Sequence, residues 1–493
     1  MTDLRSLVHS VVVPGFAGTT LPPWLADRLT AGLAGVCLFG HNVADAAAVR
    51  DLDDAVHAAR EAALVLSDEE GGEVTRLDER AGSPWPGHAA LGRVDDPEAT
   101  RQVAAAVGRQ ARAAGIDVVL APVVDVNSDP ENPVIGLRSF GDSPDLAARH
   151  GAAFVAGLQS AGVAACAKHY PGHGATRTDS HLSLPTVDAD AETLRRRDLA
   201  PFGAAVRAGA RCVMTAHVVF PALDDRPATM SPRLLGLLRA ELGFDGVVIS
   251  DALDMKAVSQ TVGRAAGAVR ALASGVDLVC IGNPCFPERY DAEKVLDEVV
   301  DALVRAVETG EVQLERLEHA SARVAALAAW AVEQRSSPDA SAAGGGDDLD
   351  LARDVAARAV ERRGTVRLTA PPLVLRAAGA PNMAAGPRPS RLVEELCRRE
   401  PATRAAEVAS VEEARAWLAS EPGRPVVVAV GPRRAAHVRP VVDAVLAARP
   451  DAVVVYTGLP EPTDAGSNVV HTYGNDRSTA AAATDLLLGE HAR

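Results

Sequence analysis

Short apolar runs and amphipathic segments alternate along the chain, and this alternation restricts the possible folds more than any other feature. The strand-like runs lie at residues 10–13, 35–39, 63–67, 116–126, 163–168, 211–217, 246–250 and 276–281. Helical patterns rich in Ala, Arg and Leu lie between most of them, at 44–62, 97–114, 144–161, 191–209 and 231–242. Alternation repeated about eight times predicts an α/β protein with an N-terminal (β/α)8 TIM-like barrel. A doubly wound open sheet is the alternative, but no Gly-x-Gly-x-x-Gly follows the first run.

The rest of the chain predicts a second, smaller domain. A length of 493 residues suggests two or three domains. Helical patterns continue from 291 to 334, and the Ser/Asp/Gly-rich stretch 336–348 has the composition of a flexible linker. Beyond it, a helical pattern at 349–363 is followed by apolar runs at 373–377, 426–430 and 453–457 and by helical patterns at 411–419, 434–448 and 478–487. We therefore expect a barrel over 1–335, a linker over 336–348 and an α/β sandwich with a parallel sheet over 349–493. The Pro/Gly-rich stretch 379–389 is expected to be a connector.

Charge and composition exclude several classes of protein. A net charge of -15 and a pI of about 5.4 argue against a nucleic-acid partner or an anionic membrane surface. No run reaches the roughly 18 apolar residues that a membrane span needs. The six cysteines fit neither a disulfide framework nor a zinc site, which indicates a reducing compartment. Residues 1–10 lack the basic start and apolar core of a signal peptide, so we expect a cytoplasmic protein.

The stretch 167–185 concentrates polar residues immediately after a buried strand-like run, as a catalytic loop on an α/β scaffold does. It contains three histidines, and Lys168 stands out in a chain with few lysines. Asp179 and His181 predict a proton-transfer pair, because a carboxylate can orient an imidazole whose ordinary pKa of about 6.5 suits acid and base duty in turn. An ordinary Asp/His pair in a turn is the alternative. His169, His173 and His181 match no metal-ligand spacing, and no metal is expected.

Asp251 is the second strong feature, since it directly follows the apolar run 247–249. A carboxylate held rigidly at the mouth of a barrel suits a nucleophile. Asp254 is expected to cap the following helix, and Asp245 to lie in a turn. His217 ends another strand-like run and fits either a residue behind the site or a core histidine.

Other polar residues follow strand-like runs too, and the carboxyl ends of barrel strands share one face. Asp68 ends the third run, Asp125 the fourth and Lys168 with His169 the fifth. Asp68, Arg76 and Arg138 suit the binding of sugar hydroxyls, because carboxylates and guanidinium groups form bidentate hydrogen bonds.

Together these motifs resemble glycoside hydrolase family 3, in its β-N-acetylhexosaminidase branch. The resemblance rests on Lys-His-Tyr-Pro-Gly-His-Gly at 168–174 followed by Asp-Ser-His at 179–181. Asp-Glu-Glu-Gly-Gly at 68–72 with Arg76, Met-Thr-Ala-His at 214–217 and Ser-Asp at 250–251 resemble further family blocks in the same order, so the match covers residues 8 to 335. The family's usual Gln between Asp and Glu is Glu69 in this chain.

The resemblance implies a retaining hydrolase that needs no cofactor and acts on a small-molecule glycoside. Asp251 would attack the anomeric carbon, and His181, supported by Asp179, would protonate the leaving oxygen and then activate water. The N-acetylglucosamine ring would be held by five residues, namely Asp68, Arg76, Arg138, Lys168 and His169. Cell-wall peptidoglycan fragments are the expected source of the terminal β-linked sugar.

Two alternatives to hydrolysis stay open. The first is phosphorolysis, because a neutral imidazole does not repel an incoming phosphate as a carboxylate does. The second is a non-catalytic sugar-binding protein, although such a protein has no need of Asp251, Asp179 and His181 together.

Overall fold

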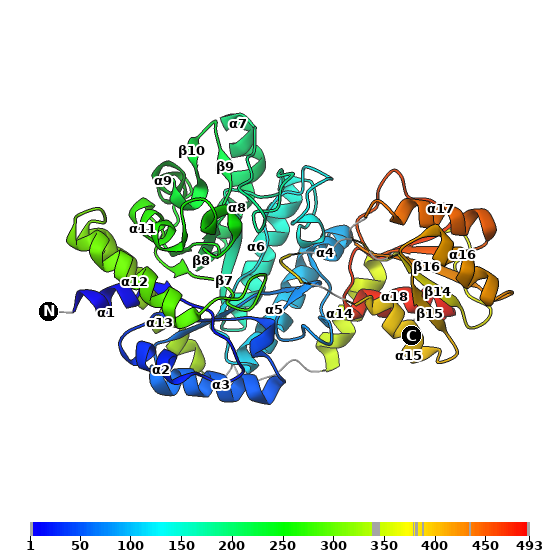
Figure 1. Ribbon diagram of the computed structural model, residues 1–493, viewed down its shortest axis with the longest axis horizontal. Coiled ribbons are helices and arrows are strands. Elements are labelled where there is room, and N and C mark those ends of the chain that lie inside the picture. Colours follow the sequence, from blue (N-terminus) through cyan, green and yellow to red (C-terminus); the bar gives the residue numbers. More distant parts are fainter. Residues whose placement is uncertain are drawn as a thin grey trace. The chain divides into compact units, whose positions relative to one another are not determined.

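A computed structural model describes residues 3–337, 346–377, 379, 383–386, 389–432 and 435–490 (Figure 1). The chain divides into two compact units. Unit 1 comprises Met1–Glu70, Thr100–Ile135 and Gly141–Gly345, and unit 2 comprises Gly71–Ala99, Gly136–Phe140 and Gly346–Arg493. Of the predicted linker 336–348, residues 338–345 lie outside the described residues, and the prediction is wrong for its last three residues because they begin helix α14 (Gly346–Ala359). Of the predicted connector 379–389, residues 380–382 and 387–388 lie outside the described residues.

Unit 1 contains a ring of parallel strands that matches the predicted barrel. Six strands pair in the order β11-β8-β7-β6-β3-β2, and β1 pairs in parallel with β12. A parallel bridge between Ile249 and Leu278 joins β11 to the β12 segment, and the N–H of Cys37 donates to the carbonyl of Pro14 over 2.9 Å to join β2 to the β1 segment. The strands are β1 (Val12–Val13), β2 (Gly35–Leu38), β3 (Leu64–Ser67), β6 (Val118–Val119), β7 (Ala164–Tyr170), β8 (Cys212–Thr215), β11 (Val247–Ile249) and β12 (Val279–Cys280). Each of the eight predicted strand segments overlaps one of them, so the barrel prediction is confirmed.

Helices follow the strands in the alternating order that a barrel requires (Figure 1). In unit 1 they are α1 (Leu4–His9), α2 (Pro23–Thr30), α3 (Ala46–Ala59), α6 (Pro144–Ser160), α7 (Ala191–Thr193), the π-helical turn η3 (Leu194–Leu199), α8 (Ala200–Arg207), α9 (Pro232–Ala240), α10 (Lys256–Ser259), α11 (Arg264–Ser274), α12 (Ala292–Glu308) and α13 (Leu314–Arg335). Helix α5 (Pro97–Ala113) starts in unit 2 and continues into unit 1. Asp45, Ser143, Ser231 and Asp291 each accept a hydrogen bond from the N–H three residues on, which fixes where α3, α6, α9 and α12 begin.

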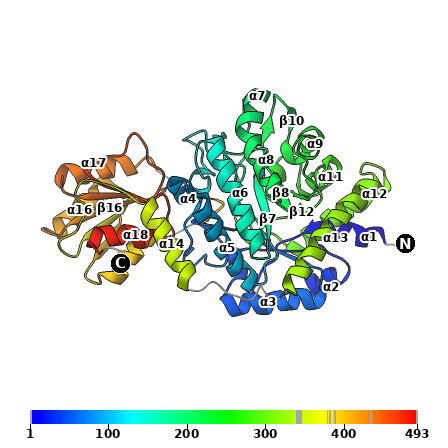
Figure 2. The same ribbon diagram turned by 180° about the vertical axis from the view of Figure 1, so that it is seen from behind.

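Helix α13 closes the N-terminal end of the barrel. Its residues Val324, Leu327, Ala328 and Ala331 share one hydrophobic core with the inward-facing residues of the strands. Two buried carboxylates bind its arginines: Asp277, just before β12, contacts Arg316 and Arg323, and Asp117, just before β6, contacts Arg335. Helix α1 packs against both α12 and α13 (Figure 2). Ionic contacts thus add to apolar packing at this end of the barrel.

His57 on α3 belongs to the same end and makes stability depend on pH. Its Nδ1 lies 2.9 Å from Asp53 and its Nε2 lies 3.4 Å from Asp117. Burial alone would lower the pKa of His57, but its hydrogen bonds with Asp117 and Asp53 raise that pKa to about 9. Since the folded-state pKa lies above the unfolded value of about 6.5, the stabilisation is complete below pH ~6.5 and is lost as pH rises through 9.

We expect His57→Gln to lower the free energy of unfolding of unit 1 by about 3 kcal/mol near pH 6 and by much less near pH 9.5. Denaturant unfolding at several pH values measures the difference between the two proteins. His319→Gln, an exposed histidine on α13, is the matched control and should change stability at neither pH. A difference between wild type and His57→Gln that stays constant with pH would contradict the assignment.

Unit 2 contains a second sheet in the order β13-β18-β17-β16-β14-β15. The strands are β13 (Glu361–Arg363), β14 (Leu373–Ala377), β15 (Arg404–Glu407), β16 (Val426–Val430), β17 (Val453–Tyr456) and β18 (Asn468–His471). All neighbours are parallel except β13 and β18. The helices of the C-terminal segment are α14 (Gly346–Ala359), α15 (Arg391–Arg399), α16 (Val411–Ser420), α17 (Val438–Ala448) and α18 (Arg477–Leu488). The predicted α/β sandwich is confirmed, with a mixed rather than a purely parallel sheet.

The predicted helix over 349–363 is wrong at its C-terminal end. Helix α14 ends at Ala359, and the next residues form the edge strand β13, which pairs with β18. The three residues of β13 are all polar, Glu361 half-buried and the two arginines exposed, so they carry no apolar pattern that would distinguish a strand from the last turn of a helix. Among the described residues, no helix combines the length and apolar character needed to cross a membrane.

Candidate active site

The carboxyl end of β7 is held between its two neighbours in the barrel. The N–H of Lys168 donates to the carbonyl of Pro122 over 3.0 Å, and the N–H of Val124 donates to the carbonyl of Lys168 over 2.8 Å. On the other side, the N–H of Ala216 donates to the carbonyl of Tyr170 over 2.7 Å. The backbone positions of Lys168 and His169 are therefore fixed before any side chain is considered.

Lys168 joins two carboxylates from the segment that follows β3. Its Nζ lies 2.6 Å from Oδ1 of Asp68 and 2.7 Å from Oε1 of Glu70. The Lys168 side chain is only 2% exposed and that of Glu70 only 1%, so each charge depends on the others for solvation. The structure thus brings together Asp68 and Lys168, two of the residues expected to bind sugar.

His169 is oriented by Asp125, which follows β6. Its Nδ1 lies 2.7 Å from Oδ2 of Asp125, whose Oδ1 also accepts from the backbone N–H groups of His169 (3.2 Å) and His173 (2.7 Å). Burial alone would raise the pKa of Asp125, but the neighbouring His169 and these hydrogen bonds lower it. An ionised carboxylate only accepts hydrogen bonds, so the proton of His169 lies on Nδ1. Nε2 then points away from Asp125.

The predicted Asp/His pair is formed. Nδ1 of His181 lies 2.7 Å from Oδ1 of Asp179, which also accepts the backbone N–H of His181 over 2.9 Å. Burial would raise the pKa of Asp179, but the hydrogen bond and charge of His181 lower it. Asp179 is 4% exposed and the His181 side chain 22%, so the carboxylate is shielded while the imidazole reaches solvent. This geometry suits an imidazole that accepts and donates a proton at Nε2.

Asp251 follows β11 on a backbone that is fixed to β12. The N–H of Ser250 donates to the carbonyl of Leu278, and the N–H of Leu253 donates to that of Cys280, both over 3.0 Å. Oδ1 of Asp251 accepts the N–H of Ala252 over 2.8 Å. Burial would raise the pKa of Asp251, but His217, His169, His181 and the Ala252 N–H together lower it. Asp251 is therefore ionised at neutral pH, as a carboxylate nucleophile must be.

His217 lies behind Asp251 rather than in the apolar core. It is fully buried, and its Nε2 donates to the carbonyl of Ala252 over 3.0 Å, while its Nδ1 lies 2.8 Å from the Thr229 hydroxyl. Burial lowers the pKa of His217, and its hydrogen bond to the Ala252 carbonyl fixes the backbone next to Asp251. The hydrogen bond to Ala252 therefore identifies His217 as a residue behind the site and not as a core histidine.

The expectation that Asp254 caps a helix is wrong. Met255 occupies the N-cap position of α10, and the Asp254 carboxylate instead accepts the N–H of Asn283 (2.6 Å) and the Tyr290 hydroxyl (3.2 Å). Burial raises the pKa of Asp254 to about 7. Asp254 thereby binds the segment after β12 to the segment that carries Asp251.

A backbone hydrogen bond brings the Asp179–His181 loop to the Asp251 side of the barrel. The N–H of Ala257, in α10, donates to the carbonyl of Ser180 over 3.3 Å. The charge of His181 also contributes to lowering the pKa of Asp251, so the two groups lie within electrostatic range. The Asp179–His181 pair and the Asp251 carboxylate therefore share one end of the barrel.

Arg76 and Arg138 belong to unit 2. Nη2 of Arg76 donates to the carbonyl of Ala384 over 3.0 Å, and Arg138 ends the short 3-10 helix η2 (Gly136–Arg138) with only 6% of its surface exposed. Their binding of sugar stays a prediction.

Several residues of the site were not selected from the sequence. Glu70 pairs with Lys168, Asp125 orients His169, and His173 contacts the Asp179–His181 loop. The available signal was the position of Glu70 and Asp125 close behind strand-like runs and that of His173 in the motif 168–174, called the signature loop below. Among the described residues, no group of three or more His, Cys, Asp or Glu side chains could hold a metal ion.

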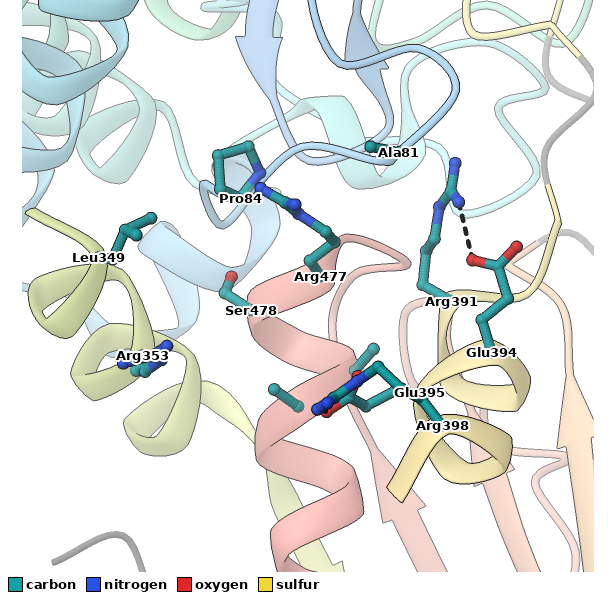
Figure 3. A pocket seen from close by; sticks show the side chains of 12 residues that line it. Ala81, Pro84, Leu349, Arg353, Arg391, Glu394, Glu395, Arg398, Arg477 and Ser478 are labelled. Carbon is teal, nitrogen blue, oxygen red and sulfur yellow. Dashed lines mark hydrogen bonds and ion pairs between the residues drawn. The ribbon is translucent and has the colours of Figure 1, made fainter. Parts of the chain in front are cut away.

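Unit 2 has a separate cavity of about 420 Å³ lined by α14, α15, the start of α18 and residues 81–84 (Figure 3). Its arginines include Arg391, paired with Glu394, and Arg398, paired with Glu395, both over 2.7 Å. None of the predicted site residues lines this cavity.

The chain belongs to glycosyl hydrolase family 3. The model of the family's N-terminal domain matches residues 22–327, which contain the strands β2 to β12 and every residue of the site described above. The class that the barrel and its polar end define is therefore a glycoside hydrolase.

Similar proteins and a similar solved structure indicate which glycoside hydrolases the chain resembles. A β-hexosaminidase A of Pseudoalteromonas piscicida is 36% identical over 340 residues, which is 63% of this chain and 56% of that protein. A β-hexosaminidase of Xylella fastidiosa is 40% identical over 287 residues, covering 56% of this chain and 83% of that protein. The solved structure of a family 3 β-N-acetylglucosaminidase from Paenibacillus sp. superposes with a TM-score of 0.86 at 32% identity, over 99% of this chain and 97% of that one.

Proposed function

We propose that the chain is a retaining exo-β-N-acetylglucosaminidase that removes terminal β-linked N-acetylglucosamine. The observation that carries the proposal is the joining of the Asp179–His181 pair to the segment after Asp251 at one end of the barrel. The similarity to β-hexosaminidases and to a β-N-acetylglucosaminidase supports the choice of sugar.

In the first step, an Asp251 oxygen forms a bond to the anomeric carbon as the bond from that carbon to the leaving oxygen breaks. The imidazolium form of His181 donates its Nε2 proton to the leaving oxygen and becomes neutral. Asp179 holds the other ring proton on Nδ1 and stabilises the charged form before transfer. The products of this step are the released alcohol and a glycosyl ester of Asp251.

In the second step, neutral His181 accepts a proton from water at Nε2 while the water oxygen attacks the anomeric carbon. The ester bond breaks, and Asp251 leaves as a carboxylate. Two inversions at one carbon give net retention. An Asp/His pair in this scheme replaces the second carboxylate that retaining glycosidases usually carry.

Asp68, Lys168 and His169 supply polar groups that bind the sugar hydroxyls in this proposal, and a role of Arg76 and Arg138 in binding sugar stays a prediction. Peptidoglycan fragments are the natural source of the terminal sugar. All six cysteines carry free thiols, four of them buried, which fits a reducing compartment and hence the cytoplasm.

The test is release of 4-nitrophenol from its β-N-acetylglucosaminide and its β-glucoside, with and without phosphate, followed by identification of the sugar. Free N-acetylglucosamine at a rate independent of phosphate is the expected result. N-Acetylglucosamine 1-phosphate would show phosphorolysis instead, and binding of the sugar without turnover would show a non-catalytic protein.

His181→Ala should lower kcat/KM strongly for substrates with poor leaving groups and much less for activated aryl glycosides. The reason is that a good leaving group needs no proton in the transition state, whereas general acid catalysis contributes about 10²- to 10⁴-fold for a poor one. A series of aryl glycosides with leaving groups of different pKa measures the dependence. His41→Ala, a histidine in the short 3-10 helix η1 (Gly40–Asn42), is a control that should leave the slope of the series unchanged. Equal losses across the series would exclude His181 as the general acid.

A further inference from the structure

Ser180 lies between the two members of the proton-transfer pair and is the most buried of the residues from 179 to 183. It is 1% exposed, whereas the side chain of His181 is 22% exposed and Leu182 is 53% exposed. A serine hydroxyl that is buried this deeply must form a hydrogen bond inside the protein, because a buried hydroxyl without a partner is costly.

The Ser180 hydroxyl contacts His173 of the signature loop, and the hydrogen-bond network defines the direction of that contact. The Thr176 hydroxyl donates to the carbonyl of His173 over 2.9 Å, so at 2.7 Å from Nδ1 of His173 it can only accept. The proton of His173 is then on Nδ1, and its Nε2 accepts the Ser180 hydroxyl proton over 2.9 Å. Burial lowers the pKa of His173 to about 4, which keeps the ring neutral and this acceptor available.

His173 is itself fixed to the site. Its backbone N–H donates to Asp125, the carboxylate that orients His169. The neighbouring Gly174 packs so closely that a Cβ would lie 1.8 Å from the carbonyl oxygen of Val126. The acceptor that Ser180 uses therefore lies on a rigid part of the loop.

The backbone of Ser180 makes a second contact in another direction. Its carbonyl accepts the N–H of Ala257 in α10, the helix that follows Asp251. One residue thus connects the pair to the signature loop through its side chain and to the nucleophile's segment through its backbone.

We propose that Ser180 is the positioning residue of the proton-transfer pair, holding Asp179 and His181 at the distance from Asp251 that proton transfer requires. The inference rests on the proposed function, since it assigns to Ser180 the placement of a general acid. Without the hydroxyl, the loop loses its hydrogen bond to His173 and becomes more mobile. His181 then lies next to the leaving oxygen less often.

The test compares Ser180→Ala with Ser183→Ala, an exposed serine three residues further along the same loop. For a poor leaving group such as the sugar of chitobiose, Ser180→Ala should lower kcat/KM about 10- to 100-fold. For an activated aryl N-acetylglucosaminide the loss should stay below about threefold, because that leaving group needs no proton. Ser183→Ala should change neither value.

Hydrogen exchange of residues 175–190 supplies a readout that does not depend on turnover. We expect faster exchange in Ser180→Ala and unchanged exchange in Ser183→Ala. A double-mutant cycle with His173→Gln should show non-additive losses if the two side chains act through one hydrogen bond. Additive losses, unchanged exchange, or equal losses on both substrates would each overturn the positioning role.

His181→Ala measured in parallel separates the two proposals. If His181→Ala shows no dependence on the leaving group, the proposed general acid fails, whatever Ser180 does to the loop. If His181→Ala shows that dependence and Ser180→Ala behaves like Ser183→Ala, only the positioning role fails.

Discussion

Asp251→Asn is expected to lower kcat by at least about 10⁴-fold while leaving the melting temperature of the protein unchanged. The amide is nearly the same size as the carboxylate, and its oxygen can still accept the N–H of Ala252. It cannot form a stable ester with the anomeric carbon, however, so the two-step route is lost. The effect should appear in kcat and in kcat/KM alike, because the missing bond forms in the transition state.

The matched control is Asp245→Asn at the opposite end of the same strand. Asp245 is exposed and precedes β11, whereas Asp251 follows it. Activity within about twofold of wild type is expected, because residues at the N-terminal end of a barrel strand serve stability rather than catalysis. The two variants thus remove one carboxylate from each end of the same strand.

Trapping the intermediate tests the same role directly. A 5-fluoro N-acetylglucosaminyl fluoride slows both steps but keeps the first one fast enough for the ester to accumulate. Mass spectrometry should find one glycosyl group per chain, on the peptide that contains Asp251. A label on another residue, or near wild-type turnover by Asp251→Asn, would remove Asp251 from the mechanism. No label together with turnover would indicate that the substrate's own acetamido group is the nucleophile.

The barrel could be predicted because each of its strands is buried on both sides. Runs such as Val247–Ile249 have no exposed face, so they read as unbroken apolar segments. Strands β15 and β18 were missed for the opposite reason. Their sequences Arg-Ala-Ala-Glu and Asn-Val-Val-His mix polar and apolar residues, and their pairing is set by neighbours such as β14 and β17 rather than by their own pattern.

The site was predictable to the extent that its chemistry is local in sequence. Asp179 and His181 are two residues apart, and their hydrogen bond follows from a single turn. The pairing of Lys168 with Glu70 joins residues almost a hundred positions apart, and it depends on β3, β6 and β7 lying side by side in register. Asp254 shows the same limit, because its partners Asn283 and Tyr290 come from the next strand's loop. The grouping of Gly71–Ala99 with the C-terminal unit likewise has no local signal.

Asp277→Ala is expected to destabilise unit 1 by about 3–5 kcal/mol without slowing the active enzyme. Asp277 is fully buried just before β12, where it binds Arg239, Arg316 and Arg323 and also accepts the N–H of Val248 over 3.0 Å. Alanine leaves three partly buried guanidinium groups without their shared carboxylate and the N–H of buried Val248 without an acceptor, and both losses are costly. Arg316 and Arg323 lie on α13, so this helix should loosen first.

Hydrogen exchange measures that loosening locally, because amides of α13 should lose protection while those of β7 retain it at mild denaturant. Asp301→Ala is the matched control. Asp301 forms an exposed ion pair with Arg5 over 2.8 Å, so its loss should lower the free energy of unfolding by less than about 1 kcal/mol.

The kcat of folded Asp277→Ala should stay within about twofold of wild type, because Asp277 lies at the end of the barrel opposite Asp251. A protein as stable as wild type would mean that α13 is held by its apolar contacts with the strands alone. A stable but slow enzyme would mean instead that the two ends of the barrel are coupled, and that the separation of stability from catalysis does not hold in this chain.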